Sequence, residues 1–129
     1  MVATVRSHTW IGRPADEVWS VVSDVGAISS WFPGIVESSA GDGTRSCKFG
    51  DIDIEEDIVT NDDSLRRLQY TVTAGMPMES HLATVDVIDN RDGCLVVYST
   101  DVKPDEIADV VGPALEGGLQ GLKESCERS

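Results

Sequence analysis

A glutamate lies among isoleucines in a segment that reads as a β-strand. In "IDIEEDI", Glu56 has the same parity as Ile52, Ile54 and Ile58, so the four side chains are predicted to share one face. A carboxyl group in such surroundings is desolvated, which raises its pKa and suits it to acid–base catalysis. The alternative is that Glu56 lies near the edge of the sheet or pairs with Arg45.

His81 is a second candidate, because it alternates in step with apolar residues of its own predicted strand. Its parity is that of Ala83, Val85 and Val87, which predicts an inward-facing imidazole. A histidine that titrates near neutrality is a natural proton shuttle. The alternative is a hydrogen-bonded histidine of the core with no chemical role.

Two tyrosines complete the set, since each offers an apolar ring and one hydroxyl group. Tyr70 shares a face with Leu68 and Val72, and Tyr98 shares a face with Val96 and Thr100. Both are equally compatible with core aromatics whose hydroxyls are satisfied. If all four polar side chains face one apolar cavity, they would orient a hydrophobic, oxygen-bearing ligand.

The chemistry open to such a set is enolisation, aldol-type ring closure or loss of water. Glu56 or His81 would act as the base while Tyr70 or Tyr98 polarises a carbonyl group. This class of reaction requires no cofactor and no covalent nucleophile. Cys47 is expected to be a small hydrophobic residue, because no histidine partner is recognisable for it.

Metal chemistry is not expected. The two histidines are far apart in sequence, and neither an H-x-x-x-H motif nor a cysteine pair is present. Alternating carboxylates at positions 51, 53, 55 and 57 are typical of a solvated strand face rather than of a calcium site. We therefore predict no bound metal.

The elements that must position these side chains follow from periodicity and turn residues. Apolar spacing predicts a helix over residues 13–26 and a second, short helix over 25–31. Short β-branched runs separated by turn signals predict an antiparallel meander after the two helices. The predicted strands cover residues 3–11, 35–40, 44–50, 52–60, 65–75, 80–89 and 94–103.

A long terminal helix is predicted after Pro104, with apolar residues at helical spacing. Gly112 and Pro113 lie within it and predict a kink or break. Gly117, Gly118 and neighbouring glycines leave little bulk, which suits either close packing or room for a ligand.

Composition narrows the classes of partner. The chain of 129 residues carries 10 basic and 23 acidic side chains, a formal charge of −13, which disfavours nucleic acid and anionic membranes. No stretch is long and apolar enough for an export signal or a membrane span. Three widely spaced cysteines suggest reduced thiols and a cytoplasmic location.

Several motifs together resemble a known family. The stretches "PADEVWSVVSDVGAISSWFPGIVES", "GTRSCKFGDIDIEEDI", "DDSLRRLQYTV" and "GMPM" resemble the polyketide cyclase/dehydrase branch of the START-like (SRPBCC, helix-grip) superfamily. The resemblance implies one α+β domain over residues 1–129 with the order β-α-α-β6-α. In that fold a seven-stranded curved antiparallel sheet wraps around a long C-terminal helix and encloses a cavity.

The resemblance also assigns individual positions. Trp31 and Pro33 match the family's W-x-P element, Arg45 a strand arginine and Glu56 a strand glutamate. Departures occur at His81, where a tyrosine is frequent, and at Tyr98, where many members carry a tryptophan. Tyr70 matches the tyrosine of the L-x-Y element, and Trp19 the tryptophan of the first helix.

The predicted function is binding of a hydrophobic polyketide-like, aromatic or lipid-like molecule, with a cyclase or dehydratase activity that uses Glu56, His81, Tyr70 and Tyr98. The alternatives are a non-catalytic carrier or sensor and, less favoured, a protein–protein module such as a chaperone cofactor. In each case the protein is expected to be a monomer or homodimer. Trp31 and the loop over residues 75–80 are expected to form opposing gates of the cavity. The remaining predicted ligand-binding residues are Phe32, Pro33, Arg45, Ile54, Ile58, Leu68, Val72, Met76, Met78, Ala83, Val96, Val111, Leu115, Gly118 and Leu119.

Overall fold

The computed structural model describes residues 1–128 and contains one seven-stranded antiparallel sheet. The strand order is β1-β7-β6-β5-β4-β3-β2, so strands β2 to β7 form a meander and β1 closes the far edge beside β7. All seven strands were predicted, with bounds that differ by a few residues. They are β1 (Ala3–Ile11), β2 (Ile35–Gly41), β3 (Thr44–Phe49), β4 (Ile52–Asp62), β5 (Arg67–Ala74), β6 (Ser80–Asn90) and β7 (Gly93–Lys103).

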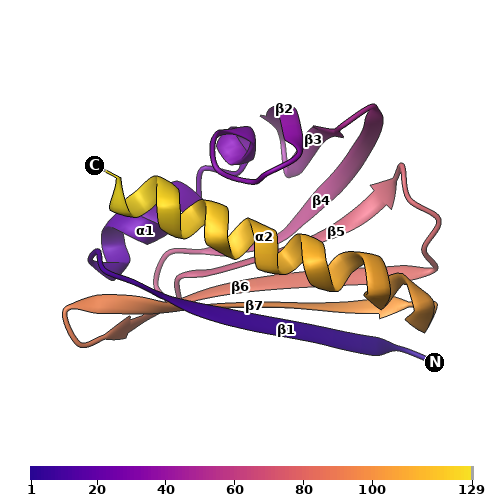
Figure 1. The fold of residues 1–129 in the computed structure, drawn as a ribbon. Coiled ribbons are helices and arrows are strands. Elements are labelled where there is room, and N and C mark those ends of the chain that lie inside the picture. Colours follow the sequence, from indigo (N-terminus) through magenta and orange to yellow (C-terminus); the bar gives the residue numbers. More distant parts are fainter. Residues whose placement is uncertain (129) are drawn as a thin grey trace.

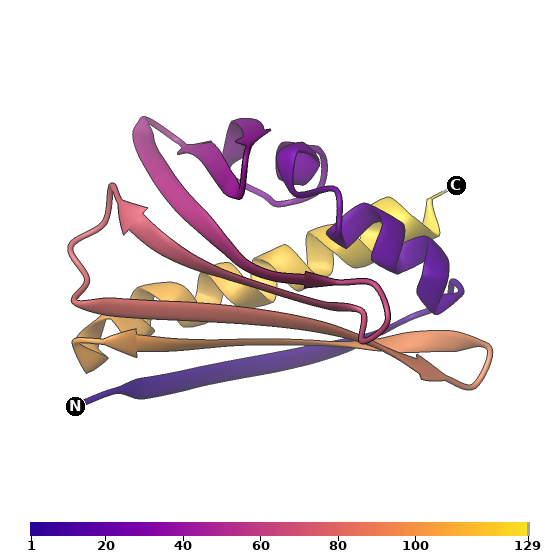
Figure 2. The same ribbon diagram turned by 180° about the vertical axis from the view of Figure 1, so that it is seen from behind.

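The helices lie on one side of this sheet. Between β1 and β2 the chain forms the helix α1 (Ala15–Val22) and the 3-10 helix η1 (Val25–Ser30). After β7 it forms the short 3-10 helix η2 (Asp105–Ile107) and the long helix α2 (Ala108–Glu127). Figures 1 and 2 show the sheet curving around α2, with β2 and β3 arching over it. This is the predicted helix-grip fold.

Helix α1 forms where the sequence predicted it. Pro14 occupies its N-cap position with an extended ψ, and two acidic residues complement the dipole in the first turn. Val18, Trp19 and Val22 are buried on its inner face. The apolar core therefore sits where α1 and the second half of α2 pack on the sheet.

Helix α2 runs unbroken through Gly112–Pro113, so the predicted break does not form. Pro113 is exposed near the start of the helix, where only one turn precedes it. Leu115, Leu119 and Leu122 are buried beyond it. Their packing outweighs the low helix propensity of the local sequence, as is usual when an amphipathic face is covered.

Two glycines of α2 allow the Trp31-Phe32-Pro33 segment to pack directly on the helix. A Cβ atom at Gly118 would lie 2.5 Å from Phe32 Cε2, and one at Gly121 would lie 2.1 Å from the Trp31 carbonyl oxygen. Both distances are shorter than any van der Waals contact. At these two positions the predicted alternative of close packing is correct.

Candidate functional site

A cavity of about 220 Å³ lies between the concave face of the sheet and the first half of α2. Its lining is mostly apolar. All four predicted catalytic residues line it, as do six predicted ligand-binding residues: Glu56, Tyr70, His81 and Tyr98, with Phe32, Ile54, Val72, Met76, Val111 and Leu115. The strand residues among them lie on the side of the sheet that alternation predicted, because one face of each strand points at the helix.

Ten of the predicted ligand-binding residues lie outside the lining. Most of them are buried in the packed interior, and Pro33 is exposed. Arg45 is buried outside the lining and contacts two lining residues, Glu56 and Tyr70. The ten are Trp31, Pro33, Arg45, Ile58, Leu68, Met78, Ala83, Val96, Gly118 and Leu119.

The sequence analysis did not single out eight further lining residues as ligand-binding. Phe49 continues the parity of Cys47 on β3, and Thr100 continues that of Tyr98 on β7, so alternation could have identified both. Ala114 follows Val110 at helical spacing. The eight are Ile28, Ile35, Cys47, Phe49, Ile52, Thr100, Val110 and Ala114.

Two adjacent aromatic residues lie between η1 and β2, of which Phe32 lines the cavity and Trp31 does not. Trp31 is buried with its ring centroid 5.7 Å from that of Phe32. Its carbonyl packs on Gly121 of α2. The geometry thus makes Trp31 a core residue behind Phe32 and does not support the gate expected at Trp31.

The mouth of the cavity is apolar. Three lining residues are substantially exposed there: Phe49 at 36%, Ile52 at 51% and Val110 at 61%. Met76 lines the cavity from the β5–β6 loop, whereas Met78 does not. The loop expected to act as a gate therefore contributes one methionine.

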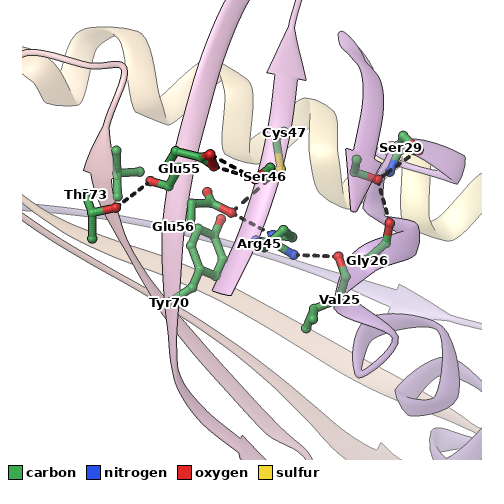
Figure 3. A network of polar contacts seen from close by, with 12 residues as sticks. Val25, Gly26, Ser29, Arg45, Ser46, Cys47, Glu55, Glu56, Tyr70 and Thr73 are labelled. Carbon is green, nitrogen blue, oxygen red and sulfur yellow. Dashed lines mark hydrogen bonds and ion pairs between the residues drawn. The ribbon is translucent and has the colours of Figure 1, made fainter. Parts of the chain in front are cut away.

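Arg45 and Glu56 face each other on β3 and β4 and form a buried ion pair, with 2.6 Å between Arg45 Nε and Glu56 Oε1. Figure 3 shows the arginine between this carboxylate and the carbonyl of Val25, to which Nη1 donates over 3.3 Å. The Cys47 thiol donates to the same Oε1 over 3.7 Å. The guanidinium carbon lies 4.6 Å from the centre of the Tyr70 ring.

Burial is the main cause of the pKa shifts of Glu56 and Cys47. It raises the pKa of the Glu56 carboxyl, although Arg45 opposes the effect by favouring the carboxylate. Glu56 Oε2 accepts no hydrogen bond from residues 1–128, so this oxygen is free for a ligand. Burial also raises the pKa of the Cys47 thiol to about 12, which makes it a poor nucleophile at neutral pH.

The hydroxyl groups of Tyr70 and Tyr98 form a short hydrogen bond inside the cavity. Burial raises the pKa of Tyr98 to about 12 and that of Tyr70 well above its ordinary value. Both hydroxyls are therefore protonated at neutral pH. Only one of the two protons is used in the bond between them, so the other hydroxyl remains a donor.

His81 lies beside this pair, with its ring centroid 5.7 Å from that of Tyr70. Its Nδ1 accepts a hydrogen bond of 3.1 Å from the backbone N–H of Val72. Burial lowers the pKa of His81 to about 4. The expected titration near neutrality is therefore wrong, and the imidazole is neutral at physiological pH.

Residues 1–128 also form a second, larger hollow. A hollow of about 700 Å³ over β2–β4 is wider and more polar, but none of the four predicted catalytic residues lines it. Residues 1–128 contain no group of three or more acidic, cysteine or histidine side chains arranged to hold a metal ion. Within the same range no helix combines the length and apolarity that a bilayer span needs.

Solved structures of similar fold cover nearly the whole chain. An uncharacterised protein from Bacillus thuringiensis has a TM-score of 0.88 at 21% identity, over 96% of this chain and 98% of that one. A protein from Thermobifida fusca has a TM-score of 0.81 at 29% identity, over 97% and 93%. The protein Ara h 8.0201 has a TM-score of 0.81 at 14% identity, over all of both chains.

Family comparison agrees with this geometry. A search among curated proteins finds no match. The sequence model described as "Polyketide cyclase / dehydrase and lipid transport" matches residues 2–127, which is nearly the full length. The chain therefore belongs to the polyketide cyclase/dehydrase and lipid transport family.

Proposed function

We propose that the protein binds a compact, mainly apolar small molecule in the cavity beneath α2. The observation that supports this most directly is the composition of the lining, in which apolar side chains surround one cluster of polar groups around Glu56, Tyr70 and His81. Such a site removes apolar surface from water and fixes the orientation of a ligand through a few hydrogen bonds. Membership of a family that includes lipid transport supports the same function.

Native mass spectrometry of the protein from its own host tests this proposal. The intact protein is expected to retain a small molecule, and Ala114→Trp is expected to lose it because the indole would fill the cavity. Gln120→Trp is the matched control, since residue 120 is exposed on the same helix. Equal retention by both variants would show that the molecule binds elsewhere.

Acid–base turnover of the bound molecule is the second part of the proposal. Glu56 supports it, because a buried carboxyl with a raised pKa and a free Oε2 faces the cavity beside two tyrosine hydroxyls. Glu56 would remove a proton from the carbon next to a carbonyl group, while a tyrosine donates to the carbonyl oxygen. Ring closure or loss of water would follow from the resulting enolate.

A panel of polyketide-like and aromatic substrates separates an enzyme from a carrier. We expect Glu56→Gln to abolish turnover while binding persists, because glutamine preserves the shape of the side chain but cannot accept the proton. Wild-type protein that returns every bound compound unchanged would instead identify a carrier or sensor. Because His81 is neutral with a pKa of about 4, it is a weak base, and Glu56 is the better candidate for that role.

A further inference from the structure

The ladder between β5 and β6 ends early, and His81 occupies the place where it would continue. Paired residues run from Arg67 and Asp86 to Tyr70 and Ala83. Beyond them, the N–H of Val72 donates to His81 Nδ1 over 3.1 Å instead of to a strand carbonyl. A backbone N–H can only donate, so Nδ1 must present its lone pair to Val72.

This hydrogen bond decides where the imidazole carries its proton. In neutral histidine one ring nitrogen is the donor and the other the acceptor. With Nδ1 accepting, the proton lies on Nε2. Residue 81 lines the cavity, so Nε2–H is the group of this ring left for a ligand.

The surroundings favour the neutral ring. The other titratable side chains of the lining are Cys47, Glu56, Tyr70 and Tyr98, and α2 contributes only apolar ones. Glu56 is the single group among them that would favour imidazolium, and its charge is already paired with Arg45. Burial accordingly lowers the pKa of His81 to about 4.

A second donor lies next to the first. Of the two hydroxyl protons of Tyr70 and Tyr98, one lies in the hydrogen bond between them, and the other remains available for donation to a ligand. The Tyr70 and His81 rings are 5.7 Å apart with an angle of 40° between their planes. Two neutral donors thus come from neighbouring side chains of the cavity lining.

We infer that this wall binds a carbonyl oxygen of a neutral ligand, with His81 Nε2–H and the Tyr70–Tyr98 pair as the two donors. This inference deepens the proposed function and rests on it. A carbonyl oxygen has two lone pairs and matches two donors. A carboxylate would fit poorly, because the cation Arg45 lies outside the lining and Glu56 adds like charge. The ligand class is therefore ketones, enones, esters or quinones rather than free fatty acids.

Binding of three compounds on one scaffold tests the ligand class: 2-acetylnaphthalene, 2-ethylnaphthalene and 2-naphthoate. The ketone is expected to bind about tenfold more tightly than the hydrocarbon, the usual scale of a net hydrogen bond or two. The carboxylate is expected to bind most weakly. Preference for the carboxylate, or equal affinity for ketone and hydrocarbon, would overturn the inference and leave the proposed function intact.

The role of His81 is tested by His81→Asn, with His8→Asn as the control. Asparagine offers Oδ1 to the N–H of Val72 but is too short to reach as far as Nε2. The ketone preference is expected to fall to about twofold in His81→Asn. It should be unchanged in His8→Asn, because His8 is exposed on β1. An unchanged preference in His81→Asn would contradict the assignment.

Long-range 1H–15N NMR spectra of the unliganded protein give a readout that needs no ligand. We expect His81 as the neutral tautomer protonated at Nε2 between about pH 5.5 and 8. A proton on Nδ1, or a charged ring at neutral pH, would overturn the donor role even if binding is found. Failure of all three compounds to bind while the expected tautomer is seen would count against the proposed function, and against the ligand class with it.

Discussion

Arg45 and Glu56 lie directly opposite each other on β3 and β4, and their ion pair is almost fully removed from water. Only 1% of the arginine side chain and 9% of the glutamate side chain are exposed. Arg45 is held from the other side by the Val25 carbonyl, so one side chain connects the wall of the cavity to η1. The pair therefore positions a carboxyl group that lines the cavity.

Breaking this pair on one side is expected to destabilise the protein. Arg45→Met leaves the Glu56 carboxyl buried without its cation, which should lower the free energy of unfolding by about 3–5 kcal/mol. Urea denaturation measures the loss. The control is Arg67→Gln, which breaks the more exposed pair with Asp86 and should cost less than about 1 kcal/mol. Equal losses would show that burial of the Arg45 pair has no energetic consequence.

The glycines of α2 are expected to respond in opposite directions to alanine. Gly121→Ala should lower the free energy of unfolding by about 1–3 kcal/mol, because the new Cβ would overlap the Trp31 carbonyl oxygen. Gly117→Ala should raise it by up to about 1 kcal/mol, because nothing lies within 4 Å and alanine is the better helix former. Thermal denaturation of both variants is the measurement. A stabilising Gly121→Ala would contradict the close approach of the Trp31-Phe32-Pro33 segment.

His81 is expected to make stability depend on pH in the acidic range. Its pKa is lowered in the folded state from 6.5 to about 4, so its contribution is present above pH 6.5 and is lost as the pH falls toward 4. At about 1.4 kcal/mol per pH unit over the interval from 6.5 to about 4, the loss is at most about 3.5 kcal/mol. Glu56 acts in the opposite sense, because its pKa is raised.

The difference between wild type and His81→Asn isolates this contribution. In denaturation experiments at several pH values, the stability of wild type relative to His81→Asn should fall as the pH falls from neutral to about 4. A gap that stays constant over this range would show that His81 titrates alike in the folded and unfolded states.

Substitutions of Trp31 and Phe32 are expected to differ in their effects on protein stability and on ligand binding. Trp31→Ala should cost about 3–5 kcal/mol of stability, because it empties a core position. Ligand affinity of the folded fraction should hold, since Trp31 does not line the cavity. Phe32→Leu should change affinity more than stability, because leucine still fills much of the space. If Trp31→Ala instead lost ligand affinity without losing stability, the result would support Trp31 as a gate of the cavity.

Local alternation made much of this molecule predictable. Successive side chains of a strand point to opposite faces, so the parity of Glu56, Tyr70, His81 and Tyr98 was enough to place them on the inner side. Turn residues delimited the strands for a similarly local reason, since proline fixes its own φ and glycine permits the positive φ that tight turns need. The family motifs added the curvature of the sheet and the helix that it holds.

Contacts between segments that are distant in the sequence could not be predicted from local alternation. Parity did not show which inward-facing residues border empty space, so Leu68 and Ala83 were expected at a cavity that they do not reach. Nor did it separate Trp31 from Phe32, because the chain leaves regular structure there and the choice follows from Gly118 and Gly121 of α2.

The sequence alone therefore determined the order of the elements and the inner face of each strand, because both depend on neighbours in the chain. The tertiary structure decided the polar contacts of the site and the protonation states of its side chains. Three contacts join residues from different strands: the Arg45–Glu56 ion pair, the Tyr70–Tyr98 hydrogen bond, and the hydrogen bond that His81 Nδ1 accepts from Val72. The Arg45–Glu56 pair was one of the alternatives that the sequence left open. The protonation of these side chains depends on burial, which is set by packing across the whole molecule and not by the local sequence.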